Sequence, residues 1–181
     1  MELINNKIKD CYLIKLDKFN DDRGFFTRAF CKKNFDKKKI LNNIKQINFS
    51  FSKKKGTIRG LHYQKKPFQE MKIIYCIKGE IYDVIVDLRE KSKTYKKYLG
   101  FTISSKNRNG IIVPKGCAHG FQTLKSNSEV IYFTTEYYNK FKETGLNYSD
   151  SSIKIRWPLK VTSISKKDLH SPKIIRWKKK F

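Results

Sequence analysis

The chain has 181 residues, of which 39% are hydrophobic and 14% aromatic, so it can bury the core of a folded domain and is not a disordered chain. No apolar run approaches the roughly 20 residues of a membrane-spanning helix, and the first ten residues lack the apolar centre of a signal peptide. We therefore expect a cytoplasmic protein with no membrane association. It should form a single domain over residues 1–181, with its core at about 44–138.

The formal net charge of +25 would suit a nucleic-acid-binding protein, but its make-up argues against that class. Only 7 of the 41 basic residues are Arg and 34 are Lys. A nucleic-acid surface more often shows Arg clusters interleaved with exposed aromatic side chains. We therefore expect no nucleic-acid partner, and a small anionic substrate suits the charge equally well.

None of the four cysteines forms a CxxC pair, so neither a zinc knuckle nor a thioredoxin-like site is indicated. Cys76 lies in an apolar stretch and suits a small core position. Cys117 lies in a predicted loop beside His119. A packing role is favoured there over a Cys/His nucleophile, which stays as the alternative.

Strand signals dominate the chain from its N-terminus. Residues 1–10 predict an edge strand or extended arm, and residues 11–16 predict a short strand. Residues 20–24, NDDRG, predict a turn before two Phe residues, and the Lys- and Asn-rich run at 32–43 suits a short helix. Further short strands are expected at 44–51, 57–64, 71–78, 81–88, 98–104, 110–113, 120–124 and 130–136.

This density of short strands and turns favours an all-β sandwich or barrel. The lack of a Gly-rich phosphate loop disfavours a Rossmann fold. After residue 138 the pattern loosens, and residues 153–158, IKIRWP, predict a last strand. Ser165 suits the N-cap of a short C-terminal helix that has Asp168 at its third position.

A histidine and an arginine lie close together in residues 57–64. Strand alternation places His62 and Gln64 on one face and would turn Arg59 to the other. Gly60, between them, predicts a bulge or a close backbone approach that re-aims a side chain.

Two residues from other strands can join this face. If the predicted strands line one barrel, Lys72 and Tyr132 converge on His62. Taken singly, each has an ordinary alternative: a hydrogen-bonded structural His, a solvated Lys and a packed Tyr. The combination is what points to chemistry.

Six segments, in order and over nearly the whole chain, resemble the nucleotide-sugar 3,5-epimerase family. They are DDRGFF (21–26), GTIRGLHYQ (56–64), DVIVDLR (83–89), PKGCAHGF (114–121), YSDSSIKIRWP (148–158) and SKKD (165–168). RGLHYQ and HGF are the specific parts. The resemblance implies an all-β, cupin-type jelly roll with a short, partly helical C-terminal extension. It also implies a homodimer whose subunits share N-terminal strands.

The resemblance implies neither a metal nor another cofactor. Many cupins bind a metal through a His-x-His pair, a Glu and a later His. Here the pair is His62 and Gln64, so an amide replaces one ligand. Besides His62, only His119 and Glu70 remain, which is too few good ligands for a tight transition-metal site.

The family implies an epimerase that acts on C3, C5 or both centres of a nucleotide-linked 4-keto sugar. His62 would be the base that forms an enolate, with Asp168 as its orienting partner. Lys72 would hold the enolate oxygen, and Tyr132 would return a proton to the opposite face. Substrate contacts carry over to Arg23, Gln46, Asn48, Arg59, His119, Glu143 and Lys167.

One position departs from the family pattern. Members that act on dTDP-sugars usually have a Glu where this chain has Arg28. A carboxylate can accept the N3–H of thymine, whereas a guanidinium has no acceptor and suits guanine O6 and N7. We therefore expect Arg28 to contact the base of a GDP-linked 4-keto heptose, for capsule or surface polysaccharide. The alternative is a dTDP-linked 4-keto-6-deoxyglucose, with Arg28 in solvent.

Two other function classes suit a jelly roll of this kind. One is a sugar-nucleotide ketoisomerase, which the RGLHYQ pattern disfavours. The other is a non-catalytic cupin binding module, which would not need to keep His62, Tyr132 and Asp168 together.

Overall fold

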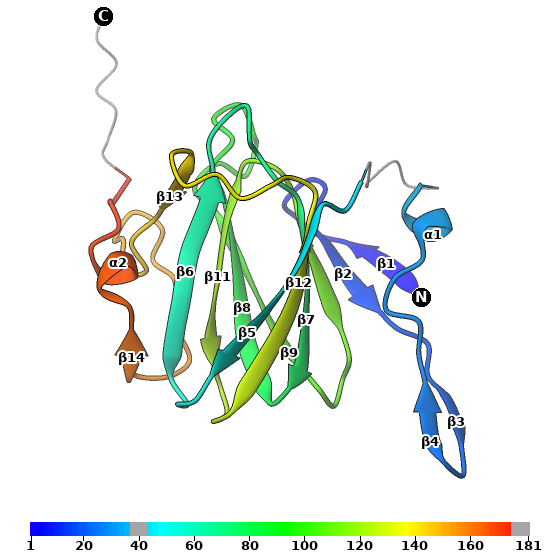
Figure 1. Cartoon of the computed structure of the whole chain (residues 1–181). Coiled ribbons are helices and arrows are strands. Elements are labelled where there is room, and N and C mark those ends of the chain that lie inside the picture. Colours follow the sequence, from blue (N-terminus) through cyan, green and yellow to red (C-terminus); the bar gives the residue numbers. More distant parts are fainter. Residues whose placement is uncertain (37–42, 175–181) are drawn as a thin grey trace, which may run out of the picture.

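Two facing β-sheets make up the body of the protein, as the computed structural model shows for residues 1–36 and 43–174 (Figure 1). One sheet has the order β1 (Glu2–Asn5), β2 (Tyr12–Lys15), β10 (Gly110–Val113), β7 (Lys72–Lys78), β12 (Ser128–Thr134) and β5 (Gln46–Ser52). We call it sheet A. The other, sheet B, has the order β13 (Glu143–Gly145), β6 (Thr57–Gln64), β11 (Cys117–Thr123), β8 (Glu80–Asp87) and β9 (Tyr98–Ser104), and β14 (Ser163–Ile164) pairs with β6. The described chain is nearly all β and has the jelly-roll fold that the sequence predicts.

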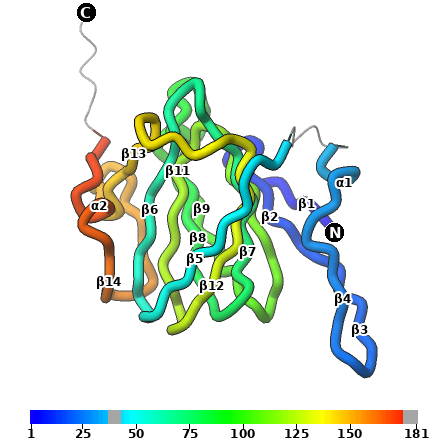
Figure 2. The backbone as a smooth tube through the Cα atoms, in the orientation of Figure 1, coloured from blue at the N-terminus to red at the C-terminus, as the bar shows by residue number. Residues whose placement is uncertain are grey.

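Two short helices and a hairpin lie outside the sheets. The helices are α1 (Lys32–Asp36) and α2 (Lys166–Leu169), and the hairpin is formed by β3 (Phe19–Asp21) and β4 (Gly24–Phe26). Figures 1 and 2 show that the hairpin projects away from both sheets. No helix within residues 1–36 and 43–174 is long and apolar enough to cross a bilayer.

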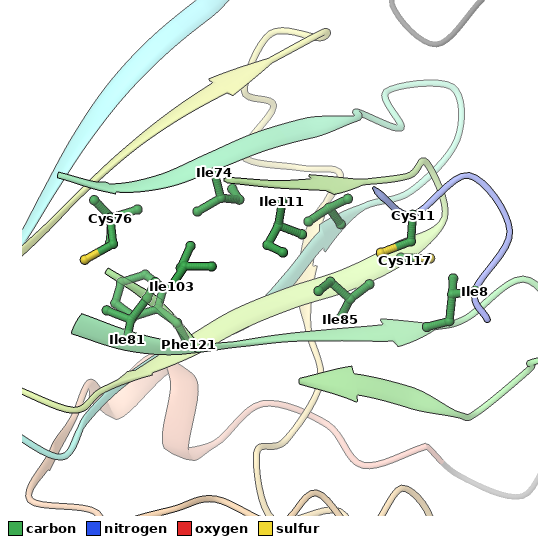
Figure 3. Close-up of a cluster of buried hydrophobic side chains, with 12 residues drawn as sticks. Ile8, Cys11, Ile74, Cys76, Ile81, Ile85, Ile103, Ile111, Cys117 and Phe121 are labelled. Carbon is green, nitrogen blue, oxygen red and sulfur yellow. The ribbon is translucent and has the colours of Figure 1, made fainter. Parts of the chain in front are cut away.

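The main hydrophobic core fills the space between the sheets (Figure 3). Ile74 and Ile111 enter it from sheet A, and Ile85 and Phe121 enter it from sheet B. Further buried clusters lie on the outer faces of the sheets, so the strands are apolar on both sides. The main core and the outer clusters both extend beyond the expected core segment: the main core includes Ile8, and the outer clusters include Phe35, Leu146 and Ile153.

Most predicted elements are confirmed, with ends shifted by a few residues. The N-terminal residues form the edge strand β1, and Ser165 caps α2 with Asp168 at its third position. The helix expected at 32–43 begins as α1, and residues 37–42 of that prediction lie outside the described residues. The very short strands β13 and β14 were not predicted, because two or three residues show no periodic pattern.

The strand predicted at 153–158 is wrong. Its apolar residues do pack, since Ile153, Ile155 and Trp157 cover the outer face of sheet B. The backbone, however, turns at its start, where the Ile153 amide donates to the Asp150 carbonyl at 3.1 Å. Alternating apolar residues therefore mark a covering segment here and not a hydrogen-bonded strand.

Candidate active site

A cavity of about 750 Å³ opens between the two sheets, within the size range of small-molecule sites. Strands of both sheets and the helix α2 line it. Ten of the residues that the sequence selected line this one cavity: Gln46, Asn48, Arg59, His62, Lys72, His119, Tyr132, Glu143, Lys167 and Asp168. Their chemical roles remain predictions.

A backbone irregularity brings Arg59 and His62 to the same cavity. The pairing of β6 with β11 shifts register between His119, opposite His62, and Phe121, opposite Arg59. Gly60 lies at this shift with a φ of +115°, and a Cβ there would lie only 2.6 Å from the Cα of Gly120. The prediction that Gly60 re-aims a side chain is therefore confirmed, and the close approach needs glycine on both strands.

His62 and Asp168 form a hydrogen-bonded pair on the sheet B wall. The Nε2 atom of His62 lies 2.7 Å from Oδ1 of Asp168. The other carboxylate oxygen accepts the Gly60 amide at 3.1 Å, and the Asp168 amide donates to Ser165 Oγ at 3.0 Å. Asp168 is thus fixed both to β6 and to the start of α2.

The charge on Asp168 decides the basic atom of His62. Burial opposes ionisation of Asp168, but the hydrogen bond and charge of His62 and the Gly60 amide outweigh it and lower the pKa of the carboxyl. An ionised carboxylate can only accept, so the proton of neutral His62 lies on Nε2. The lone pair is then on Nδ1, which leaves this nitrogen free to act as a base.

Tyr132 and Lys72 stand on the opposite wall, in sheet A. Tyr132 lies on β12 with Val130 and Thr134, which also line the cavity, as alternation predicts. The pKa of the Tyr132 hydroxyl is raised, chiefly by burial and then by the negative charge of Glu70. Arg59 acts in the opposite direction, and Glu143 adds a smaller increase. Tyr132 is therefore held as a protonated phenol, a donor and not an acceptor of protons.

Lys72 begins β7, beside β12, and forms an ion pair within the cavity. Its Nζ lies 3.0 Å from Oε1 of Glu70, and both side chains are largely buried. A cation at this place can stabilise an anionic oxygen on a bound molecule.

Two further ionised groups lie next to His62 at the cavity rim. Glu143 accepts from Lys167 and, at 2.9 Å, from the hydroxyl of Tyr138. Burial of Glu143 works against its charge, but these contacts lower the pKa of the carboxyl. The same contact with Glu143 raises the pKa of Lys167.

His119 forms a second His–Asp pair, deeper in the barrel than the first. Its Nε2 lies 2.7 Å from Oδ2 of Asp83, a side chain with no exposed surface. Within the part of the chain that the structure describes, the other Asp83 oxygen has no hydrogen-bond partner. His119 also pairs across the strands with His62, so the two imidazoles line the same cavity.

Arg23 and Arg28 do not join this group. Both are exposed, and they lie in or next to the projecting hairpin of β3 and β4. The Arg23 guanidinium pairs with Asp21 at 2.6 Å. The chain's own cavity therefore lacks two of the twelve site residues that the sequence predicts.

Sequence reasoning passed over Glu70 and Tyr138. From the sequence, Glu70 is named only among the metal ligands of cupins, yet it lies two residues before Lys72, the spacing that places side chains on one face of an extended chain. That spacing was a usable signal. Tyr138 follows the last predicted strand of the core and carries no such signal.

The structure gives little support to two other kinds of site, a Cys/His nucleophile and a metal centre. Cys117 begins the strand β11 and does not lie in a loop; burial raises the pKa of its thiol to about 12, which suits packing and not a nucleophile. Among residues 1–36 and 43–174, no three His, Cys, Asp or Glu side chains are grouped closely enough to hold a metal ion.

The jelly roll and its cavity, with a His–Asp pair on one wall and a Tyr and a Lys on the other, define a cupin-type protein. Residues 5–175 match the sequence model of the dTDP-4-dehydrorhamnose 3,5-epimerase family, and the chain belongs to this family. It is accordingly an isomerase of the epimerase type.

Three relatives resemble the chain over nearly their whole length. The dTDP-4-dehydrorhamnose 3,5-epimerase of Shigella flexneri is 36% identical, with 97% of each chain covered. The crystal structure of the Bacillus anthracis enzyme, with TDP and PPi bound, has 40% identity and a TM-score of 0.93 over 96% of this chain and 99% of its own. The Legionella pneumophila enzyme, in complex with dTDP-4-keto-L-rhamnose, has 35% identity and a TM-score of 0.89 over 94% and 90%.

Proposed function

We propose that the protein is a 3,5-epimerase of dTDP-4-keto-6-deoxyglucose. The observation that carries the proposal is the placement of the two proton-transfer groups. His62 stands on β6 of sheet B, and Tyr132 stands on β12 of sheet A, on the other side of the same cavity. Inversion of a carbon centre needs a base on one face of the sugar ring and an acid on the other, and this arrangement supplies both.

The reaction proceeds by removal and replacement of one proton at each centre. The C4 carbonyl makes the C–H bonds at C3 and C5 acidic, so Nδ1 of His62 takes a proton while Lys72 stabilises the negative charge that forms on the C4 oxygen. Tyr132 gives its proton to the same carbon from the opposite face, which inverts it. The reaction leaves an imidazolium, stabilised by Asp168, and a tyrosinate, and proton exchange with solvent restores both.

The sequence leaves two substrates open: the GDP-linked 4-keto heptose that Arg28 indicates, and the dTDP-linked 4-keto-6-deoxyglucose. The comparisons support the dTDP reading better, because the relatives from Bacillus anthracis and Legionella pneumophila hold TDP and a dTDP-sugar. In this chain Arg28 is exposed and does not line the cavity. Arg59, which does line it, suits the diphosphate that both nucleotides share.

We further propose a homodimer in which the hairpin of β3 and β4 completes the cavity of the other subunit. The hairpin projects from the barrel and presents apolar side chains that are 45% to 63% exposed: Phe19, Phe25 and Phe26. A large apolar group at the tip of a projecting hairpin is costly unless another surface covers it. In such a dimer, Arg23 of the partner subunit would bring a guanidinium to the diphosphate.

A second exposed surface supports the dimer. The edge strand β5 turns Gln46 and Asn48 toward the cavity and alternates them with outward apolar residues. These outward residues are 48% to 71% exposed: Ile47, Phe49 and Phe51. An uncovered, apolar edge strand is a place where a second chain can pair.

A reducing compartment suits the cysteines. All four are free, and three of them are buried. Disulfides are rare where thiols are kept reduced, so we place the enzyme in the cytoplasm.

The proposed activity can be tested by deuterium exchange. The protein is incubated in D₂O with dTDP-4-keto-6-deoxyglucose and, separately, with a GDP-linked 4-keto sugar, and the product is examined by NMR. We expect deuterium at C3 and C5 of the dTDP-sugar together with inverted configuration. Exchange only with the GDP-sugar would overturn the proposed substrate, and transfer of the keto group without inversion would indicate a ketoisomerase.

A further inference from the structure

Glu70 is a buried carboxylate that lines the cavity and takes no part in the proposed proton transfers. Its side chain is 9% exposed, and it lines the cavity beside Lys72 and Tyr132. One oxygen lies 3.0 Å from Nζ of Lys72, and the other accepts a hydrogen bond from Nε2 of Gln64. Burying a carboxylate is costly unless its oxygens are paired, and here both are.

The frame around Glu70 is fixed by hydrogen bonds on both sides. Gln64 is buried, its Nε2 lies 3.0 Å from the Phe68 carbonyl, and its Oε1 accepts the Asn139 amide at 2.6 Å. Met71, the next residue, pairs through its amide with Thr135 Oγ1 at 2.9 Å and through its carbonyl with the Thr135 amide at 3.1 Å. The Glu70 carboxylate and the residue that follows it are therefore both held by hydrogen bonds.

Lys72 needs such a partner. A lysine side chain is a point charge on a flexible four-carbon stem, and it has no preferred position of its own. Within the described residues, Glu70 is the carboxylate that forms an ion pair with it. An ammonium has three donors, so one bond to Glu70 leaves two for an oxygen on the substrate.

We infer that Glu70 is a positioning residue that holds the Lys72 ammonium where the enolate oxygen forms. The inference rests on the proposed function, because it gives Lys72 a defined task in enolate formation. The amide of Gln64 acquires a role as well: it stands where cupins have a second metal-binding His, and here it orients Glu70.

The test begins with Glu70→Gln, which keeps the size of the side chain and removes its charge. We expect kcat to fall about 10- to 100-fold, because a misplaced catalytic group costs up to about that factor. KM and the affinity for dTDP should stay unchanged. Glu136→Gln is the matched control, since Glu136 also pairs with a lysine, Lys45, but neither residue lines the cavity. Its kcat should equal that of the parent.

A double-mutant cycle separates positioning from a general structural effect. In a Lys72→Met background, Glu70→Gln should cause no further loss of the residual deuterium-exchange rate, because its target is already absent. An equal further loss in both backgrounds would overturn the inference, and so would a Glu70→Gln variant with the kcat of the parent or with weakened dTDP binding.

A measurement without substrate completes the test. Lys72 is acetylated with acetic anhydride, and its labelling rate is followed by mass spectrometry against that of the exposed Lys154. We expect labelling of Lys72 to accelerate severalfold in Glu70→Gln and to stay unchanged in Glu136→Gln. Unchanged Lys72 labelling would overturn the inference. The labelling experiment needs no substrate, so its result holds even if the parent protein does not act on a dTDP-sugar. A failure of the Glu70 inference can therefore be distinguished from a failure of the proposed function.

Discussion

At the scale of single residues, the carboxylate of Asp168 decides which nitrogen of His62 can accept a proton. The contact from Nε2 leaves Nδ1 as the basic atom. Across the cavity, burial and Glu70 keep Tyr132 protonated. Under the proposed reaction, the two groups are thus in the protonation states that a base and an acid need before any substrate binds.

Tyr132→Phe tests whether His62 and Tyr132 act separately as base and acid. It removes only the hydroxyl, so His62 can still form the enolate, but no proton arrives from the other face. We expect epimerised product to fall at least about 100-fold, the lower range for a lost general acid. Deuterium uptake with retained configuration should persist, as followed by NMR in D₂O. Tyr82→Phe, outside the cavity, is the control.

The contrasting variant is His62→Asn, which should lose both deuterium uptake and product. Full inversion by Tyr132→Phe would show that water or another group supplies the second proton.

Arg28 carries the only residue-level argument for guanine. Because it is exposed and the relatives hold thymidine nucleotides, we expect calorimetric titration to show dTDP binding about tenfold more tightly than GDP, a difference of about 1.4 kcal/mol. Arg28→Glu should leave this preference unchanged, because the side chain is exposed and does not line the cavity. Tighter binding of GDP by the parent would return the GDP-linked heptose to first place.

At the scale of elements, the four-residue helix α2 serves to deliver one carboxylate. Ser165 caps it, and Asp168 at its third position reaches across to the Gly60 amide and the His62 ring. A helix this short has little stability alone. The contacts of Asp168 with β6 therefore help to hold the C-terminal segment on the barrel.

Asp168→Asn should destabilise the fold in a pH-dependent manner. The folded protein lowers the pKa of Asp168, so its ionised form contributes stability above the usual carboxyl pKa near 4, and this contribution is lost as the pH falls through the lower folded value. We expect the variant to lose about 1–3 kcal/mol of unfolding free energy at pH 7. The difference from the parent should shrink below about pH 4.

Urea unfolding at several pH values measures this difference. Ser165→Ala, which removes the cap but keeps the carboxylate, should show a loss of about 1 kcal/mol with a smaller change between pH 7 and pH 4, because Ser165 contributes less than His62 or Gly60 to the lowered pKa of Asp168. A pH-independent effect of Asp168→Asn would mean that its charge does not stabilise the fold.

Much of the fold and most of the site were predictable from sequence, for identifiable reasons. Alternation along β12 predicted that Tyr132 faces the cavity with Val130 and Thr134, and the glycine at position 60 indicated the irregularity in β6. The contact between Gln64 and Glu70 was not predictable, because it depends on how the intervening loop folds back. The segment 153–158 misled because a covering chain and a strand bury the same alternating pattern.

At the scale of the whole molecule, Arg23 lies outside the cavity whose diphosphate it would contact under the proposed function. Arg23 stands on a hairpin that projects from the barrel, with its side chain 89% exposed. The proposed dimer resolves this, because each hairpin would then serve the other subunit.

Subunit complementation tests the shared site. Arg23→Ala and His62→Asn should each be poorly active alone. When equal amounts are unfolded and refolded together, hybrid dimers should have one cavity with an intact His62 and an intact Arg23 from the partner. We expect about a quarter of the parent activity, since half of randomly formed dimers are hybrids with one complete site each. No recovery, despite dimers in light scattering, would place each hairpin at its own subunit.

The two walls of the cavity belong to different sheets, and this gives the hydrophobic core an influence on stereochemistry. Packed sheets lie about 10 Å apart, and the side chains between them, such as Ile74, Ile85 and Phe121, set that separation. Under the proposed reaction, a flat enolate must fit within this separation, with the base His62 on one face of the ring and the acid Tyr132 on the other. A change such as Ile85→Val would thus act on the efficiency of inversion through the spacing of the two sheets, although Ile85 is a core residue and not a proton-transfer group.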